Sequence, residues 1–459
     1  MAITTSLVTI VKRFVAPALP QPTQQYDVNY FQQFNNVLRL YFNQLDQLLA
    51  KIVTTSGDTV PVSINGTNTD AFGRLRISQP YTLFDSQNRY ASDNQFDVAT
   101  TGTGSTTYLP NESSVQMSVT AGGVGSVKRQ SYRVMPYQPG KGLLVLATFV
   151  MDSSQSLNLT QRVGYYNDQN GVFFQRVDGT YSFVLRSYVT GSVSDARTVN
   201  QADWNGDKLD GTGASGLTLD PSKAQILWMD FEWLGVGSVR CGFIINGQYI
   251  VCHTFQNAND ITSVYMTTAI LPVRYEISTS SALAASMKAI CCSVISEGGF
   301  EQISVDHVAS RPTAFATIGT TFVPLVSIRL ASTALGAVVL PNRVQVLPTT
   351  SQNYEVALIK NGALGGATAW TAVPSDPNVQ QDVGSTTITG GAIVQLDYVT
   401  SSGSGGVVPL NSATGYNWDL QLGVSVAGVS DIYTVAVRVI NTPPTGDAVG
   451  MISFYDLTY

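Results

Sequence analysis

The sequence contains few charged residues and no long apolar run, and each shortage argues against a class of function. Charged residues make up 12% of the 459. Lysine and arginine number 25 against 31 for aspartate and glutamate, a net charge of −6, whereas a protein that neutralises many phosphates has the opposite balance. No apolar run approaches the roughly 18 residues that a membrane span needs. We therefore expect neither a nucleic-acid partner nor membrane insertion.

Histidine is also scarce, which limits the catalytic chemistry open to the chain. His253 and His307 are the two histidines, and the sequence contains neither an HExxH nor a GxSxG motif. His253 follows a cysteine in an expected strand, where a structural role is the simpler interpretation. We expect no enzymatic activity and no cofactor.

The four cysteines do not form a zinc motif. Cys291 and Cys292 are adjacent, and Cys241 and Cys252 have no CxxC partner. A two-residue turn at Asn246-Gly247 would place Cys241 directly opposite Cys252 across a hairpin, so a bridge is geometrically possible. A reducing compartment favours free thiols instead.

A segment near the N-terminus carries the heptad pattern of a coiled coil. Residues 1–25 contain three prolines and read as an extended arm. After the arm, apolar residues alternate spacings of three and four, as the a and d positions of a coiled coil do. These expected oligomerisation positions are Phe31, Phe34, Leu38, Tyr41, Leu45, Leu48 and Ile52.

The apolar stripe of this helix is wider than a two-stranded seam would cover. Tyr30, Val37, Phe42 and Leu49 flank the seam and are also apolar. A trimer or larger bundle therefore fits better than a dimer. The alternative is one amphipathic helix that lies on its own domain, but its position ahead of any folded module favours self-association.

From residue 54 onward the sequence is typical of antiparallel β structure. Short β-rich runs alternate with turn dipeptides, and hairpin turns are expected at Asn65-Gly66, Asp178-Gly179, Asn246-Gly247 and Asn361-Gly362. The fold class is therefore mainly β, with two antiparallel β-sandwich (jelly-roll) domains after the helix. A break at about 309–323 separates them. We expect four segments: arm and oligomerising helix, 1–53; connecting β segment with an FGRLR motif, 54–95; first sandwich, 96–312; C-terminal sandwich, 313–459.

Two groups of carboxylates are candidates for binding. In ILWMDFEWLG, strand alternation puts Asp230 and Glu232 on one face, as paired carboxylates of a β-sandwich glycosidase would be. The outer glutamates of the ExDxxE pattern are missing, so a ligand face or a structural pair is favoured over catalysis. Asp203, Asp207 and Asp210 lie in a glycine-rich loop that could suit calcium, without EF-hand spacing; a solvated turn is the favoured interpretation and no metal site is expected. Trp233 alternates to the opposite face and is expected in the core.

Three segments resemble virion structural proteins of tailed bacteriophages, particularly marine and cyanobacterial ones. They are TQQYDVNYFQQFNNVLRLYFNQLDQL, DAFGRLRISQPYTLFDSQNRY and LDGTGASGLTLDPSKAQILWMDFEWLGVGSVRCGFIINGQYIVCHTFQNAN. The resemblance, together with the threonine- and glycine-rich C-terminal region, covers most of the chain. It implies a lectin-like middle sandwich and a place in the tail, baseplate or head fibres. No catalytic residues come with it.

From the resemblance and the physical pattern together we expect a virion subunit that is made in the host cytoplasm. Its partners would be itself, as a trimer, other virion proteins and host-surface glycan. Arg74 and Arg76 share one face of an extended segment and are candidate subunit contacts, although an ordinary exposed face fits equally well. Two alternatives remain: a glycan-degrading depolymerase, which needs clustered carboxylates in a groove, and a stand-alone carbohydrate-binding module, which would not need the heptads.

Overall fold

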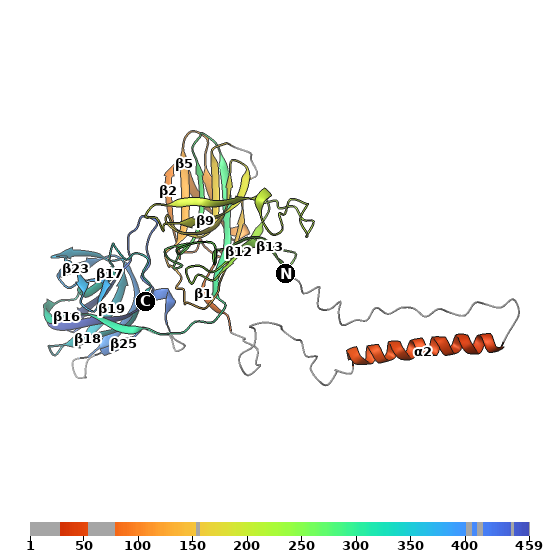
Figure 1. Ribbon diagram of the computed structural model, residues 1–459. Helices are drawn as coiled ribbons and strands as arrows, with labels where there is room; N and C mark the ends of the chain where they lie inside the picture. The colour runs from red at the N-terminus through yellow and green to blue at the C-terminus, as the bar shows by residue number, and fades with distance from the viewer. Residues whose placement is uncertain are drawn as a thin grey trace. The chain divides into compact units, whose positions relative to one another are not determined.

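The computed structural model divides the chain into two units, Met1–Ile77 and Ser78–Tyr459, which are considered separately (Figure 1). It describes residues 28–53, 79–152, 157–400, 406–410, 416–441 and 445–458, with side chains of the first range given for 30–42. The FGRLR segment with Arg74 and Arg76, and the expected turn at Asn65-Gly66, lie outside these residues. No helix among the described residues is long and apolar enough to cross a membrane.

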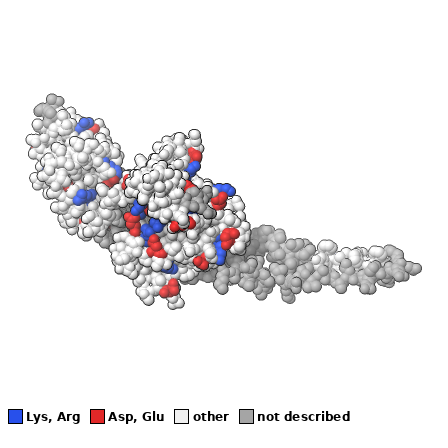
Figure 2. Space-filling view, turned by 90° about the horizontal axis from the view of Figure 1, so that it is seen from above, with Lys and Arg blue, Asp and Glu red and all other residues white. Residues whose placement is uncertain are grey.

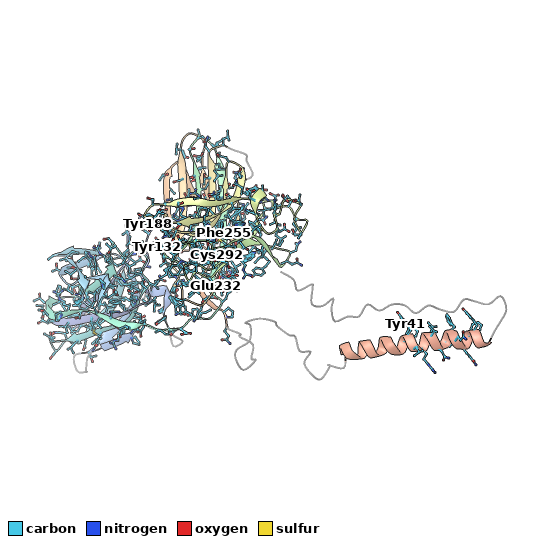
Figure 3. All side chains as sticks on the ribbon, in the orientation of Figure 1. Tyr41, Tyr132, Tyr188, Glu232, Phe255 and Cys292 are labelled. Atoms are coloured by element: carbon cyan, nitrogen blue, oxygen red, sulfur yellow. The ribbon has the colours of Figure 1, made fainter. Side chains whose placement is uncertain are left out.

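The N-terminal unit contains one helix, α2, which spans Val28–Val53. The sequence predicted this helix, and all seven expected seam positions fall within it. Phe31, Leu40 and Phe42 are exposed, at 45%, 60% and 58%. Figure 3 draws the side chains of the helix, among them Tyr41. The expected coiled coil stays a prediction. The side chains of Leu45, Leu48 and Ile52 lie outside the described residues.

The second unit begins with a sandwich of two antiparallel sheets. The β11 sheet has the order β13-β12-β11-β6-β15-β4-β3, with β1 beside β15. Its strands are β1 Tyr81–Gln87, β3 Gly104–Leu109, β4 Ser114–Val119, β6 Leu143–Val150, β11 Gln225–Phe231, β12 Val239–Ile245, β13 Gln248–Phe255 and β15 Ala285–Ser296.

The β8 sheet packs against the β11 sheet and has the order β10-β9-β8-β7-β14-β5-β2. Its strands are β2 Phe96–Gly102, β5 Gly125–Ser131, β7 Leu159–Tyr166, β8 Gly171–Val177, β9 Thr180–Ser187, β10 Ser194–Asn200 and β14 Val273–Thr279. The connections contain two 3-10 turns, η1 Pro110–Glu112 and η2 Gln201–Asp203.

Strand alternation explains the core of this first sandwich. In β6, Leu143, Val145, Ala147 and Phe149 are buried, and the residues between them are partly exposed. The buried set faces apolar residues of the β8 sheet, including Phe174, because successive side chains of a strand point to opposite faces. The sheets therefore enclose one apolar layer, as the sequence predicted.

Two of the predicted hairpins are confirmed and one is wrong. Asp178-Gly179 joins β8 to β9, and Asn246-Gly247 joins β12 to β13, in each case with positive φ at both turn residues. Asn361-Gly362 follows β19, but β19 pairs with β24 and β26 instead of the next strand. The Asn361 N–H donates at 2.8 Å to the carbonyl of Ile432, the first residue of β26, so pairing with β26 extends to Asn361.

A second sandwich follows. The β18 sheet has the order β16-β27-β18-β25, the β17 sheet has the order β21-β22-β17-β26-β19-β24, and β20 pairs with β23. Their bounds are β16 Val305–Ile318, β17 Val323–Leu330, β18 Val339–Pro348, β19 Tyr354–Lys360, β20 Ala363–Gly366, β21 Trp370–Val373, β22 Asp376–Asp382, β23 Ser385–Thr389, β24 Ala392–Val399, β25 Gly406–Pro409, β26 Ile432–Val439 and β27 Gly446–Asp456. The 3-10 turn η3 spans Trp418–Leu420.

The strand bounds show where the chain changes from one sandwich to the other. The predicted break at 309–323 is largely occupied by β16, which pairs with β27 despite Pro312 because the ladder shifts register after Arg311. The change of sheet falls between β15 and β16. At the other end β1, which was assigned to a connecting segment, pairs with β15. Separate folding of the two sandwiches stays a prediction.

Candidate ligand-binding site

The structure places the two carboxylates of the predicted pair, at the end of β11, in different surroundings. Asp230 is buried and forms an ion pair with Arg240, its cross-strand neighbour on β12. Glu232 lies beyond the end of β11, where strand alternation no longer applies, and is exposed at the end of the first sandwich (Figure 3). The chain turns there, with the Gly237 N–H donating to the Trp233 carbonyl at 2.9 Å.

A different carboxylate, Glu297, lies close to Asp230. A Cβ atom on Gly142 would stand 3.2 Å from Glu297 Oε2 and 3.7 Å from Asp230 Oδ1, so the two carboxylates approach the same glycine. Partial burial, followed by the negative charge of Asp230, raises the pKa of Glu297, while Arg240 opposes the rise. Glu297 therefore keeps its proton to a higher pH than an ordinary glutamate.

Next to this carboxylate cluster is a hollow that we call the aromatic cavity. Its volume is ≈ 570 Å³, which lies within the range of small-ligand sites, roughly 300–1,000 Å³. The residues that matter most for the argument are Tyr137, Gln138, Lys141, Trp233, Phe300 and Glu301.

Trp233 forms one wall of the aromatic cavity in a fixed orientation. Its indole N–H donates to the Met266 carbonyl at 3.2 Å, and its ring meets Tyr137 edge to face at 5.9 Å. The Tyr137 hydroxyl accepts from the backbone N–H groups of Trp233 and Leu234 at 3.1 and 3.2 Å. The sequence placed Trp233 in the core; it packs against the core while also lining the cavity.

Polar groups form the rim of the aromatic cavity. The Gln138 side chain bonds to the Glu301 backbone in both directions, at 2.6 and 2.9 Å. Lys141 Nζ donates to Gln138 Oε1 at 2.9 Å and lies 3.6 Å from Glu301 Oε1. Aromatic walls with fixed donors and acceptors at the edge suit a ligand that has an apolar face and a polar perimeter.

The loop aspartates act as acceptors in turns. Asp207 accepts from the N–H groups of Leu209 and Ser215 at 2.9 and 2.6 Å, and Asp210 accepts from the Thr212 N–H at 2.8 Å. Asp203 is exposed. Within the described ranges, no group of three or more histidine, cysteine, aspartate or glutamate side chains could hold a metal ion.

Cys241 and Cys252 are both free and buried. The register of β12 and β13 shifts between Cys241 and Gly242, so His253, not Cys252, is the cross-strand partner of Cys241. The sequence-based expectation of a directly opposed pair was wrong because it assumed a hairpin without a bulge.

A second polar cluster lies on the outer face of the β8 sheet, but its groups satisfy one another. The rings of Tyr166 and Phe173 are tilted against each other with centres 4.5 Å apart, outside the main core, and Arg186 lies over both rings. Arg186 donates two bonds of 2.8 Å to Asp195. We assign this cluster to stabilising the sheet.

Most of the aromatic cavity could not be found from the sequence. Its walls come from segments near residues 137, 233 and 300, which strand pairing brings together. The run MPYQPGKG at 135–142 carries a tyrosine between prolines, and this was the available signal. Charged atoms of both signs are interspersed on a mostly uncharged surface (Figure 2), in keeping with a site that relies on neutral polar groups.

Comparison with known proteins gives no family. No family model and no curated protein matches the sequence. Among solved structures, the CBM2 module of the evolved Dit of Lactobacillus casei BL23 phage J-1 is 5% identical with a TM-score of 0.33, covering 49% of this chain and 100% of that chain. Arcelin-5, a lectin-like defense protein from Phaseolus vulgaris, is 8% identical with a TM-score of 0.30, covering 48% and 99%. The carbohydrate recognition domain of Emp47p is 10% identical with a TM-score of 0.30, covering 47% and 95%. Likenesses this low transfer no ligand and no role.

Proposed function

We propose that this chain is a non-enzymatic structural subunit of a tailed-phage virion, which self-associates through α2 and presents its sandwiches to host-surface glycan. The resemblance of three sequence segments to virion proteins supports the assignment of the chain to a virion. The N-terminal region would attach the subunit to other virion proteins, and the β unit would face outward. The ligand would be a saccharide held in the aromatic cavity.

The observation that carries the proposal is the contrast between a helix with exposed apolar side chains and a cavity with aromatic walls. On α2, Phe31 and Phe42 are about half exposed, at 45% and 58%. Burying each such side chain contributes roughly 1.5–3 kcal/mol, which a second and third copy can supply. Trp233, in turn, offers a ring face beside fixed polar groups.

Saccharide binding is tested with the full chain against oligosaccharides from the host surface, by isothermal titration calorimetry. Trp233→Ala should weaken binding at least about tenfold, a loss of about 1.4 kcal/mol, because the stacking wall is removed. Leu234→Ala is the matched control, since Leu234 is a neighbour with an exposed side chain. Equal affinity of the folded Trp233→Ala protein and the parent would place the ligand elsewhere.

Attachment is tested by competition during particle assembly. Labelled full-length chain should enter particles, and Leu38→Asp chain should enter much less, because the charge disrupts the α2 seam. Imaging of the labelled particle then locates the subunit on head or tail. Equal incorporation of both chains would mean that the β unit carries the anchor.

Absence of catalysis is part of the proposal, and the depolymerase is the alternative. Asp230 is held by Arg240, and Glu232 does not join it, so the proposal expects purified protein to leave host polysaccharide intact. Reproducible release of reducing ends, lost in Glu297→Gln or Glu232→Gln, would establish the alternative.

A further inference from the structure

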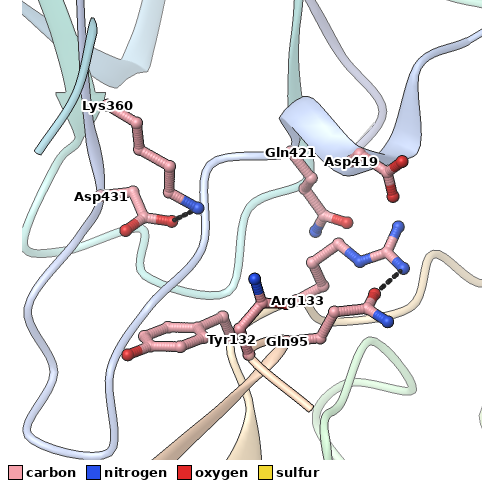
Figure 4. A pocket seen from close by; sticks show the side chains of 8 residues that line it. Gln95, Tyr132, Arg133, Lys360, Asp419, Gln421 and Asp431 are labelled. Atoms are coloured by element: carbon pink, nitrogen blue, oxygen red, sulfur yellow. Dashed lines mark hydrogen bonds and ion pairs between the residues drawn. The ribbon is translucent and has the colours of Figure 1, made fainter. Parts of the chain in front are cut away.

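A second hollow, which we call the polar pocket, lies between the two sandwiches of the β unit (Figure 4). Its volume is ≈ 410 Å³. Asn94, Gln95, Tyr132 and Arg133 come from the first sandwich. The second sandwich contributes its other lining residues, Lys360, Asp419, Gln421 and Asp431.

One side of the polar pocket is fully bonded. Asp431 accepts from Lys360 Nζ at 2.9 Å, from Asn361 Nδ2 at 2.7 Å and from the Gly423 N–H at 3.0 Å. Lys360 Nζ also lies 5.9 Å from the centre of the Tyr132 ring. The bonds of Asp431 therefore lie within the second sandwich, and Lys360 approaches the first sandwich at Tyr132.

The opposite side has unused hydrogen-bonding capacity. The Arg133 guanidinium donates from Nη2 to Gln95 Oε1 at 2.7 Å and lies over the Phe84 ring at 5.1 Å. A guanidinium has five N–H donors, and the described residues supply no other hydrogen-bond acceptor for it. Burial, partly offset by Asp419 and other acidic groups, lowers the pKa of Arg133. The remaining donors therefore face a partly dehydrated space.

Asp419 faces this guanidinium without bonding to it (Figure 4). Its backbone N–H donates to Asn417 Oδ1 at 3.3 Å, but within the described part of the chain its carboxylate accepts no hydrogen bond. Gln421 Nε2 donates to the Val134 carbonyl at 2.9 Å, which leaves Gln421 Oε1 as an acceptor at the pocket. The donors of Arg133 and the acceptors of Asp419 and Gln421 thus lie near one another on this side of the pocket (Figure 4).

The charge balance of the polar pocket selects a neutral ligand. Two cations, Arg133 and Lys360, are matched by two anions, Asp419 and Asp431. An anion would be attracted by Arg133 but repelled by Asp419, and a cation would meet the reverse. Adjacent hydroxyls of a sugar both accept and donate, so they can bond to the guanidinium and the carboxylate together. The volume lies within the range of small-ligand sites, roughly 300–1,000 Å³.

We propose that the polar pocket binds one neutral sugar residue, with its hydroxyls bridging Arg133 and Asp419, as a site separate from the aromatic cavity. The inference requires neither the virion role nor saccharide binding at Trp233. Because the lining comes from both sandwiches, an occupied pocket also ties them together and raises the unfolding temperature.

The test titrates the full chain with glucose, galactose, mannose and N-acetylglucosamine, and with glucuronate as the anionic probe, by saturation-transfer NMR. At least one neutral sugar should bind. Asp419→Asn and Arg133→Gln should each weaken it about tenfold, the equivalent of one charge-assisted hydrogen bond. Arg89→Gln, at an exposed position that lines neither cavity, should leave this binding unchanged.

The outcomes separate this inference from the proposed function. Loss of binding in Asp419→Asn with retention in Arg89→Gln supports the polar pocket, even if host glycan never binds at Trp233. Asp419 is exposed, so its variant remains informative if Arg133→Gln fails to fold. Binding of glucuronate alone, no binding of any neutral sugar, or unchanged binding in Asp419→Asn would overturn the inference.

Discussion

The helical unit and the β unit treat their apolar side chains in opposite ways. On α2, Phe31, Leu40 and Phe42 face outward, while in the β unit Phe149, Phe174 and many others have no exposed surface. A sheet pair can cover its own apolar faces, but a lone amphipathic helix cannot. The β unit has its own cores, whereas the described part of α2 leaves apolar side chains exposed, and the proposed self-association would cover them.

The largest expected effect is on the mass of the purified protein in solution, which reports its oligomeric state. Leu38→Asp places a charge in the α2 seam and should reduce the mass from about three copies to one copy of 49.1 kDa. Sedimentation equilibrium measures it. Asn36→Asp introduces the same charge at an exposed position of the same helix and should leave the mass unchanged. Equal masses for Leu38→Asp and the parent would mean that the α2 seam does not hold copies together, and the contrast between the helical unit and the β unit would be lost.

A smaller effect is expected from a core change in the β unit. Phe174 is fully buried between the sheets and contacts Phe149, Phe183 and Phe243. Phe174→Ala should lower the free energy of unfolding by about 3–5 kcal/mol without changing the mass, because the lost contacts lie within one copy. Denaturant titration measures the loss, with exposed Tyr249→Ala as the control. A change in oligomeric mass would show that the β unit also depends on its neighbours.

The smallest effect concerns a buried carboxyl in the second sandwich. Burial, and to a lesser degree the negative charge of Asp456, raises the pKa of Asp376. The folded chain thus holds this proton more tightly than the unfolded chain, so stability falls as the pH rises from the ordinary aspartate pKa through the raised value. Asp376→Asn removes this titratable group. As the pH rises from 4 to 7, the free energy of unfolding of the variant should therefore increase relative to that of the parent. The same change in the free energy of unfolding for both proteins between the two pH values would contradict this.

The sequence predicted local structure better than long-range contacts. The Asp178-Gly179 turn and the alternation of apolar residues around it predicted β8 and β9. A two-residue turn fixes the register of the two strands and therefore which side chains lie on each face of the sheet. The helix α2 was likewise readable from its spacing. Neither the bulge at Cys252 nor the β16 strand through Pro312 leaves a local signal, and each produced an error. The polar pocket was missed because Arg133 and Asp419 are far apart in the sequence.

The strand β1 determines how tension from the N-terminal unit would enter the β unit. It pairs with β15 from Tyr81–Ser296 to Gln87–Cys291, and β15 is paired on its other side with β6. A pull along the axis of β1 loads these hydrogen bonds together, in shear, instead of opening them one after another. If α2 is the tether, β1 is the mechanical clamp through which a subunit anchored at one end resists a load on its sandwiches.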